Sequence, residues 1–219
     1  MMREIDEWAL AQELERAETN YHLLKESGVR AISVMGTTGS GKTLLIERII
    51  DRIAPCGLAI ATIAGDAVGD EDHRRFLAHG VLSAPVNGEN PSYLKPQEVH
   101  EALSSLPLAE IDLLFIENVG GLVAPADHPL GAQIDVVVVS VTEGEATVRK
   151  HPDIFTQTDI LVVNKIDLVD AIGVDAQRIV EDYSLINPHG RAILTDAQHH
   201  RGIDDLLQAL GIECATAQW

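Results

Sequence analysis

Residues 36–43 read GTTGSGKT and match the pattern G-x-x-x-x-G-K-[ST] at every position. In such a loop the backbone N–H groups turn inward around phosphate oxygens, and the following helix directs the positive end of its dipole at them. The segment follows an apolar run and precedes a helical pattern, which is the context that the motif requires. We therefore expect Lys42 to contact the β- and γ-phosphates and the Thr43 hydroxyl to bind Mg²⁺. The predicted nucleotide-binding residues of this loop are Gly36, Thr38, Gly39, Ser40, Gly41, Lys42 and Thr43.

A second motif, NKID at residues 164–167, directly follows the apolar run 160–163. It resembles the guanine-specificity element of GTP-binding proteins. The Asp167 carboxylate can accept hydrogen bonds from N1–H and the 2-amino group of guanine, whereas adenine offers an acceptor at N1 and no amine. A carboxylate buried against the wrong base stays unpaired, at a cost of roughly 1–3 kcal/mol. With Asn164 at the other edge of the base and Lys165 over its face, the motif predicts GTP and GDP as ligands.

A short loop after the last apolar run is expected to complete the base site. Residues 194–198 read LTDAQ and resemble the S-A-K loop of GTPases, with Asp196 and Gln198 in place of the Ser and the Lys. The backbone N–H of Ala197 can still be offered to guanine O6. We therefore add Ala197 to the nucleotide-binding residues.

Two carboxylates that end apolar runs are candidates for the Mg²⁺ site. The run 111–116 ends in Glu117, an arrangement in which the acid holds Mg²⁺ directly or through water. Gly120 follows where a backbone N–H can meet the γ-phosphate. Asp66 ends an earlier run and is expected to act as a switch carboxylate that senses Mg²⁺ and the γ-phosphate, the alternative being an N-cap for the next helix. The predicted Mg²⁺ ligands are thus Thr43, Asp66 and Glu117, and the predicted catalytic residues are Lys42, Asp66, Glu117 and Gly120.

The elements that position these motifs alternate along the chain. Short β-branched runs occur at 29–35, 58–63, 111–116, 134–141, 160–163 and 192–194, and helical patterns at 42–54, 70–79, 96–106, 173–186 and 203–210. Strands that alternate with helices indicate βαβ units, and ligands bind at the carboxyl ends of the strands. We expect an α/β fold of the P-loop NTPase type, with a mainly parallel sheet in three α/β/α layers. One GTPase domain accounts for residues 1–219.

A long helix is expected at residues 3–27, which lack Gly and Pro. Leu10, Leu14, Ala17, Tyr21 and Leu24 recur at spacings of four and three, and so form one apolar stripe. The stripe predicts a helix that packs on the side of the domain. Participation in a dimer contact is the alternative.

Charge and composition exclude several classes of partner. The formal net charge is −18, which excludes a broad nucleic-acid-binding face and disfavours anionic membranes. The apolar runs are too short to cross a bilayer, and the first residues are acidic rather than apolar. We therefore expect a cytoplasmic protein without nucleic-acid or membrane partners. Cys56 and Cys214 form no C-x-x-C pair and are expected to be separate thiols.

Beyond the nucleotide motifs, the chain resembles the HypB-type GTPases that incorporate nickel into hydrogenase and urease. The resemblance covers nearly the whole chain, and it is carried by residues 43–48, 112–120, 140–144, 150–155 and the helix before the P-loop. It implies a metallochaperone GTPase with Mg²⁺ as cofactor of GTP and GDP, which dimerises with GTP and delivers nickel to a metalloenzyme precursor. An accessory maturation protein is a further implied partner.

The resemblance does not extend to the metal ligands of that family. Ser92, Tyr93 and Gln97 stand where the family typically carries a Cys-His pair and a second His, and Ala124 stands in place of a further Cys. The sequence therefore assigns no residues to a Ni²⁺ or Zn²⁺ site. The histidines that could substitute are His100, His128, His199 and His200, although a solvated surface histidine is far more common than a ligand.

Three functions follow as hypotheses. The first is a GTP-hydrolysing factor in nickel-hydrogenase maturation, active as a homodimer and slow without a partner, because no arginine finger is evident. The second is a GTPase chaperone for another metal-cofactor enzyme, such as a corrinoid-dependent one, which the missing ligands favour. The third is a nucleotide-gated scaffold without metal delivery.

Overall fold

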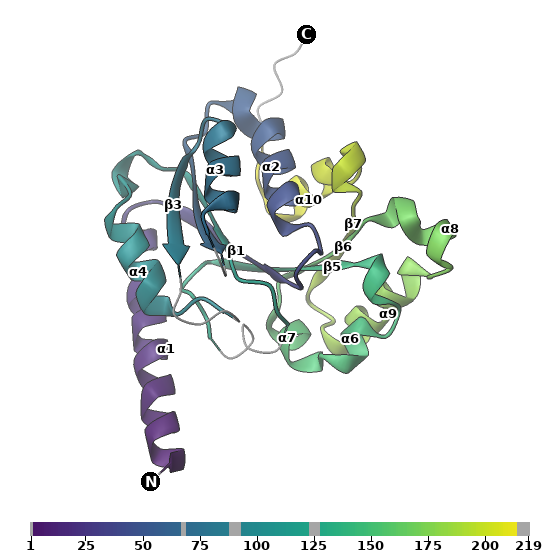
Figure 1. The fold of residues 1–219 in the computed structure, drawn as a ribbon, viewed down its shortest axis with the longest axis horizontal. Coiled ribbons are helices and arrows are strands. Elements are labelled where there is room, and N and C mark those ends of the chain that lie inside the picture. Colours follow the sequence, from purple (N-terminus) through teal and green to yellow (C-terminus); the bar gives the residue numbers. More distant parts are fainter. Residues whose placement is uncertain (1, 67–68, 88–92, 123–127, 214–219) are drawn as a thin grey trace.

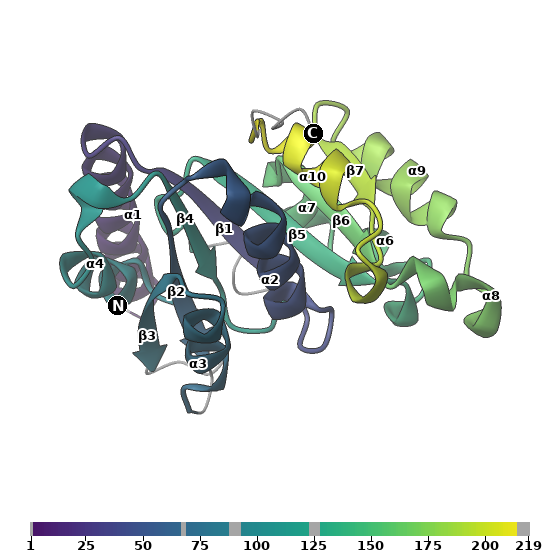
Figure 2. The ribbon, with the colours of Figure 1, turned by 90° about the horizontal axis from the view of Figure 1, so that it is seen from above.

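The computed structural model describes residues 2–66, 69–87, 93–122 and 128–213. Its centre is a seven-stranded sheet in the order β3-β2-β4-β1-β5-β6-β7, in which every neighbouring pair is parallel (Figures 1 and 2). The strands are β1 (Arg30–Gly36), β2 (Ile60–Asp66), β3 (Leu82–Asn87), β4 (Leu113–Glu117), β5 (Ile134–Ser140), β6 (Ile160–Asn164) and β7 (Arg191–Leu194). The expected α/β architecture with a parallel sheet is confirmed.

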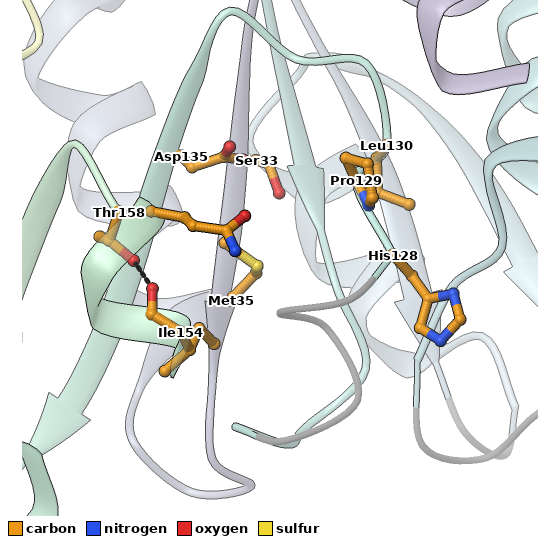
Figure 3. Close-up of a pocket in the computed structure, with 9 residues that line it drawn as sticks. Ser33, Met35, His128, Pro129, Leu130, Asp135, Ile154 and Thr158 are labelled. Carbon is orange, nitrogen blue, oxygen red and sulfur yellow. Dashed lines mark hydrogen bonds between the residues drawn. The ribbon is translucent and has the colours of Figure 1, made fainter. Parts of the chain in front are cut away.

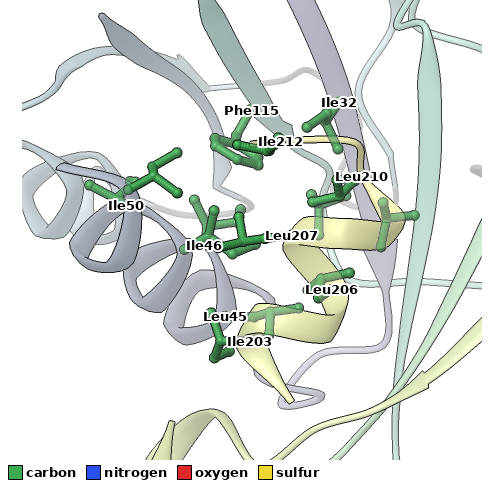
Figure 4. Packing of buried hydrophobic residues seen from close by; sticks show 14 of the residues in the cluster. Ile32, Leu45, Ile46, Ile50, Phe115, Ile203, Leu206, Leu207, Leu210 and Ile212 are labelled. Carbon is green, nitrogen blue, oxygen red and sulfur yellow. The ribbon is translucent and has the colours of Figure 1, made fainter. Parts of the chain in front are cut away.

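Helices cover both faces of the sheet, which gives three layers. They are α1 (Met2–Glu26), α2 (Lys42–Ile53), α3 (Glu71–Ala78), α4 (Pro96–Ser104), α6 (Thr147–Lys150), α7 (Pro152–Gln157), α8 (Val169–Ile172), α9 (Ala176–Ile186) and α10 (Ile203–Ala209). On one face, α2, α3 and α10 pack in a single apolar cluster that contains Ile46, Phe76 and Leu206 (Figure 4 shows its α2 and α10 part). On the other face, α1 and α4 cover one half of the sheet, and α6, α7 and α9 cover the other half.

The edge strand β3 was missed by the sequence analysis. It reads LSAPVN, and its Pro85 argues against a strand from sequence alone. β3 nevertheless pairs with β2, because Pro is tolerated where the strand has a partner on one side only. The helices α6, α7 and α8 were also missed, since each is shorter than two turns.

The helix α1 packs along only half of its apolar stripe. Ala17 and Leu24 are buried, but Leu14 is 47% exposed and Leu10 is 39% exposed. The reason is the position of the helix, because its N-terminal end projects past the body of the domain (Figure 1). The predicted packing of this helix on the side of the domain is therefore confirmed for its C-terminal half, whereas the N-terminal half of the stripe is exposed.

Cys56 is disulfide-bonded, which overturns the expectation of a thiol at this position. It ends the short 3₁₀ helix η1 (Ala54–Cys56), which directly follows α2. The second cysteine, Cys214, lies outside the described residues.

Candidate nucleotide-binding site

The predicted phosphate-binding loop connects β1 to α2 at the carboxyl end of the central strand. Gly41 has φ 97°, and a Cβ at this residue would lie 2.5 Å from Nδ2 of Asn164, so the position requires glycine. Lys42 is buried, and its ammonium donates to the carbonyl oxygens of Gly36 at 3.1 Å and Thr37 at 3.2 Å. Burial lowers the pKa of Lys42, while the charges of Glu117, Asp72 and Glu143 oppose the shift.

Glu117, at the end of β4, has the environment of a cation ligand. The Thr43 hydroxyl donates to its Oε1 at 2.8 Å, and its buried Oε2 has no hydrogen-bond partner. Burial, followed by the repulsion of Asp72, raises the pKa of Glu117 to about 8, against the opposing effects of Lys42, Thr43 and Arg75. A free, buried carboxylate oxygen beside a hydroxyl matches the oxygen ligands that Mg²⁺ prefers. Thr43 and Glu117 therefore fit a Mg²⁺ site.

The loop after β4 lies directly against the phosphate-binding loop. The Gly121 N–H donates to the carbonyl of Gly36 at 3.0 Å, and a Cβ at Gly120 would lie 2.2 Å from Oγ1 of Thr38. Only glycine fits at position 120, which brings the backbone of this loop next to Thr38. That Gly120 contacts a γ-phosphate stays a prediction.

Asp66 is the last residue of β2 and lies at the same edge of the sheet, although its side chain is outside the described part of the structure. The alternative reading, that Asp66 caps the next helix, is wrong. The N-cap of α3 is Asp70, four residues further along the chain. The role of Asp66 as a switch carboxylate stays a prediction.

Asn164 connects the phosphate-binding loop to the loop after β7. Its Nδ2 donates to the carbonyl of Ser40 at 2.9 Å, and its Oδ1 accepts from the Thr195 hydroxyl at 3.0 Å and from the Ala197 N–H at 3.1 Å. One N–H of the amide remains for a base. The Ala197 N–H, expected at guanine O6, is engaged with Asn164, so a bond to the base must share or replace this contact.

The other two residues of the guanine motif have side chains at the surface of the site. Lys165 has φ 63°, and its ammonium donates to the carbonyl of Gly39 at 2.6 Å, so its stem runs from one loop to the other. Asp167 is exposed, in the 3₁₀ helix η4 (Ile166–Leu168). That these two side chains contact a guanine base stays a prediction.

Charged residues that the sequence analysis missed also reach this site. A cleft of about 350 Å³ is lined by the phosphate-binding loop, Glu117 and two residues of α3, Asp72 and Arg75. Arg75 forms two hydrogen bonds of 2.8 Å with the carboxylate of Glu47 on α2. Glu143 accepts a hydrogen bond of 2.6 Å from Thr37 of the phosphate-binding loop. No motif marked Asp72 and Arg75, because single charges on helices are ordinary features of a surface, and the segment 140–144 was noted for its resemblance to the family without a role for Glu143.

A separate small cavity of about 30 Å³ lies against β1 and β5, near His128 (Figure 3). Asp135 lines it, and burial raises the pKa of this carboxyl to about 6, with repulsion from Asp159 acting in the same direction and a hydrogen bond with Ser33 opposing. The cavity has room for about one water molecule. It is too small for a nucleotide.

A family model described as "CobW/HypB/UreG, nucleotide-binding domain" matches residues 30–193, which contain the phosphate-binding loop, Glu117 and the guanine motif. The chain belongs to the CobW/HypB/UreG family. This family membership agrees with the resemblance recognised in the sequence and supports nucleotide binding of the P-loop GTPase type.

Relatives and solved structures of the family are similar over most of this chain. The probable hydrogenase maturation factor HypB of Methanocaldococcus jannaschii is 44% identical over 192 residues, which cover 88% of this chain and 86% of that protein. HypB of Escherichia coli K12 is 35% identical over 182 residues, which cover 82% of this chain and 61% of that protein. The crystal structure of HypB from Archaeoglobus fulgidus superposes with a TM-score of 0.84 at 39% identity, covering 92% of this chain and 98% of that one. A HypB structure from Helicobacter pylori in complex with nickel, also at 0.84 but 24% identical, supports the fold alone.

In this CobW/HypB/UreG chain the described positions of the HypB-type metal ligands have other contacts. Tyr93 stacks on His128, with ring centroids 4.0 Å apart, and Nδ1 of His128 contacts the carboxylate of Glu13 on α1. Gln97 donates to Glu101 at 2.9 Å. Ser92 and Ala124 lie outside the described residues. The described residues thus provide a packed aromatic pair and an amide where the resemblance implied imidazole ligands.

His100, another candidate metal ligand, belongs to a structural network. Its Nδ1 donates to Oδ1 of Asn20 on α1 at 2.9 Å. The Nδ2 of Asn20 donates to the carbonyls of Pro96 at 2.8 Å and Leu130 at 3.1 Å. His100 therefore helps to join α1 to α4.

In the part of the chain that the structure describes, no helix is long and apolar enough to span a membrane.

Proposed function

We propose that this chain binds GTP and GDP together with Mg²⁺, hydrolyses GTP, and acts as a nucleotide-controlled maturation factor for a nickel hydrogenase. The observation that carries the proposal is the free, buried Oε2 of Glu117 beside the Thr43 hydroxyl, in a family member whose guanine motif is bonded to the phosphate-binding loop. Relatives named hydrogenase maturation factor HypB support the biological role.

The chemistry at the phosphates follows from the residues that are present. Thr43 and Glu117 would hold Mg²⁺, which would neutralise charge that develops on the phosphoryl oxygens. When a nucleotide binds, the Lys42 ammonium donates to phosphate oxygens instead of to the carbonyl oxygens of Gly36 and Thr37. No described arginine is placed as a finger, because Arg75 of the cleft is paired with Glu47. Hydrolysis is therefore slow until a partner protein or a second copy of the chain completes the site.

The γ-phosphate provides the switch. Asp66 ends β2 and Gly120 lies in the loop that follows β4, so both residues would be in reach of a γ-phosphate and its Mg²⁺ and would couple the two loops to the nucleotide state. The resemblance to HypB implies that this ordered state forms a homodimer. Mass by light scattering tests this point, with one subunit expected with GDP and two with a non-hydrolysable GTP analogue plus Mg²⁺.

Base specificity is tested by replacing the carboxylate of the guanine motif. Asp167→Asn keeps one oxygen that can accept from N1–H but replaces the acceptor for the 2-amino group of guanine with an NH₂ group, which can donate to the 2-oxo group of xanthine. We expect GDP affinity to fall by about tenfold to a hundredfold, as for roughly 1–3 kcal/mol, and affinity for xanthosine diphosphate to rise. Fluorescent-nucleotide titration with an ADP control measures both. Unchanged GDP affinity in Asp167→Asn contradicts the guanine assignment.

The nickel role is tested through the client enzyme. Deletion of the gene in the source organism is expected to leave hydrogenase without nickel and inactive, and added Ni²⁺ or the intact gene to restore it. Loss of activity in a corrinoid-dependent enzyme instead, with normal hydrogenase, supports the alternative of a chaperone for another metal-cofactor enzyme. If the protein releases no phosphate from GTP, either alone or with cell extract added, the result supports the third hypothesis, a nucleotide-gated scaffold.

A further inference from the structure

Three potential metal ligands meet at the base end of the nucleotide site. Asp167, Asp196 and His199 each offer one ligand atom, and these atoms all lie within 4.8 Å of one another. Nδ1 of His199 lies 2.7 Å from Oδ2 of Asp196. They are the one such group of three found among the described residues. None of the three contacts the phosphate-binding loop in this structure, so the group is distinct from the Mg²⁺ ligands at Thr43 and Glu117.

The loop that carries two of these ligands is held rigidly. Asp196 is fully buried, and its Oδ1 accepts from the backbone N–H of His199 at 3.1 Å. Asp196 and Arg201 exchange two backbone hydrogen bonds of 3.1 Å and 3.0 Å, which close the loop at its base. The turn between them passes through His200 at φ 60°. Ligands held in this way lose little conformational entropy when an ion binds.

One imidazole and two carboxylates suit a divalent transition-metal ion. Imidazole nitrogen favours Zn²⁺, Ni²⁺ and Cu²⁺ over Mg²⁺ and Ca²⁺, and three protein ligands leave a further position for water. Two ligand atoms that share one tetrahedral ion at about 2.0–2.2 Å lie roughly 3.4 Å apart. The His199 to Asp196 distance of 2.7 Å must therefore lengthen by about 0.7 Å when an ion binds. An ion at Nδ1 would take the place of the proton between the two groups, and the neutral imidazole would carry that proton on Nε2 instead.

We propose that Asp167, Asp196 and His199 bind one divalent transition-metal ion, for which Zn²⁺ is the probe, when no guanine base is present. The ion and the guanine nucleotide then exclude each other, because a carboxylate that coordinates an ion cannot also accept both hydrogen bonds of guanine. The exclusion rests on the proposed role of Asp167 in base recognition, whereas the metal site rests on geometry alone.

Calorimetric titration of Zn²⁺ into nucleotide-free protein, with Mg²⁺ in excess, tests the site. We expect one ion per chain at this site and an affinity that falls at least tenfold in His199→Ala. The matched control is His200→Asn, which removes the neighbouring imidazole, keeps a residue that tolerates positive φ, and leaves Zn²⁺ affinity unchanged. His199 is 57% exposed on its side chain, so its removal leaves the fold intact, which thermal melting checks. Zn²⁺ affinity that is the same in His199→Ala as in the parent overturns the site.

The exclusion is tested by repeating the titration with saturating GDP. An apparent Zn²⁺ affinity at least tenfold weaker supports it, and an unchanged affinity overturns it. The result separates the two proposals, because GDP binding is measured independently by fluorescent nucleotide. Normal GDP binding without a Zn²⁺ site removes this inference and leaves the proposed function. If Zn²⁺ binding depends on His199 but the protein does not bind GDP, the metal site stands, and both the proposed function and the mutual exclusion of ion and nucleotide are contradicted.

Discussion

Two buried asparagines organise two different regions of this molecule. Asn164 joins the phosphate-binding loop to the loop after β7 with three hydrogen bonds, and Asn20 joins α1, α4 and the segment at Leu130, also with three. The first region is made of residues that nucleotide chemistry requires. In the second region, residues that the family resemblance associates with metal are replaced by the Tyr93–His128 stack. Both regions are therefore held together by the same number of asparagine hydrogen bonds, but only the first keeps the residue types that its expected ligand requires.

Substitution of Gly41 is expected to have the largest effect in the nucleotide region. Gly41→Ala places a Cβ 2.5 Å from Nδ2 of Asn164 at φ 97°, so both strain and collision act. Gly39→Ala is the control, since its φ is also positive at 79° but its Cβ would have open space around it. We expect losses in unfolding free energy of about 3 kcal/mol and about 1 kcal/mol respectively, by urea denaturation without nucleotide. Equal losses would mean that the contact with Asn164 does not matter.

Replacing each asparagine compares the two regions directly. Asn164→Ala and Asn20→Ala each leave buried partners unpaired, at a cost of about 2–3 kcal/mol of unfolding free energy. GDP affinity is expected to fall more than tenfold only in Asn164→Ala, because Asn20 lies on the other side of the sheet from the phosphate-binding loop. Calorimetry of GDP binding at a temperature where both variants are folded measures this. A similar loss of affinity in Asn20→Ala would show that the two regions are coupled.

The raised pKa of Glu117 predicts a pH effect that is confined to the nucleotide region. Mg²⁺ must displace the proton of this carboxyl, so Mg²⁺ affinity with GDP bound is expected to rise as pH increases towards about 8 and then to level off. The rise is about tenfold per pH unit below the pKa if one proton is released. Unfolding free energy without Mg²⁺ has the opposite trend, because the folded state holds the proton more tightly, and stability decreases as pH rises from 4.5 to about 8. Glu117→Gln should abolish the rise in Mg²⁺ affinity and the stability loss between about pH 6 and 8, whereas Asp135, with a pKa raised to about 6, still contributes below that range.

The smallest expected effect comes from the second region. His128→Ala removes the stack on Tyr93 and the contact with Glu13. Both partners are near the surface, so we expect a loss of about 1 kcal/mol of unfolding free energy and no change in GDP affinity. Glu13→Gln, which keeps the shape and removes the charge, is expected to cost less than His128→Ala. A loss of nucleotide binding in His128→Ala would contradict the separation of the two regions.

The positions of the nucleotide motifs on the sheet were predicted from short contiguous sequences. The phosphate-binding loop, the strand that ends in Glu117 and the guanine motif were each placed at the correct edge of the correct strand. Asp72 and Arg75 were missed although they line the same cleft, because nothing in α3 distinguishes them from ordinary helix charges. The edge strand β3 was missed for a different reason, since its Pro85 is compatible with a strand only at an edge.

By itself the sequence determined the chemistry that depends on neighbouring residues, namely the glycines that expose backbone N–H groups, the lysine among them and the carboxylate that is predicted to read guanine. These follow from local backbone geometry and from the identity of the side chain. Only the tertiary structure decided which distant groups meet: Asn164 with Ser40 and Ala197, Tyr93 with His128, and Asp167 with His199. Such contacts depend on the order of the strands in the sheet, which packing of the whole chain sets and no local pattern encodes.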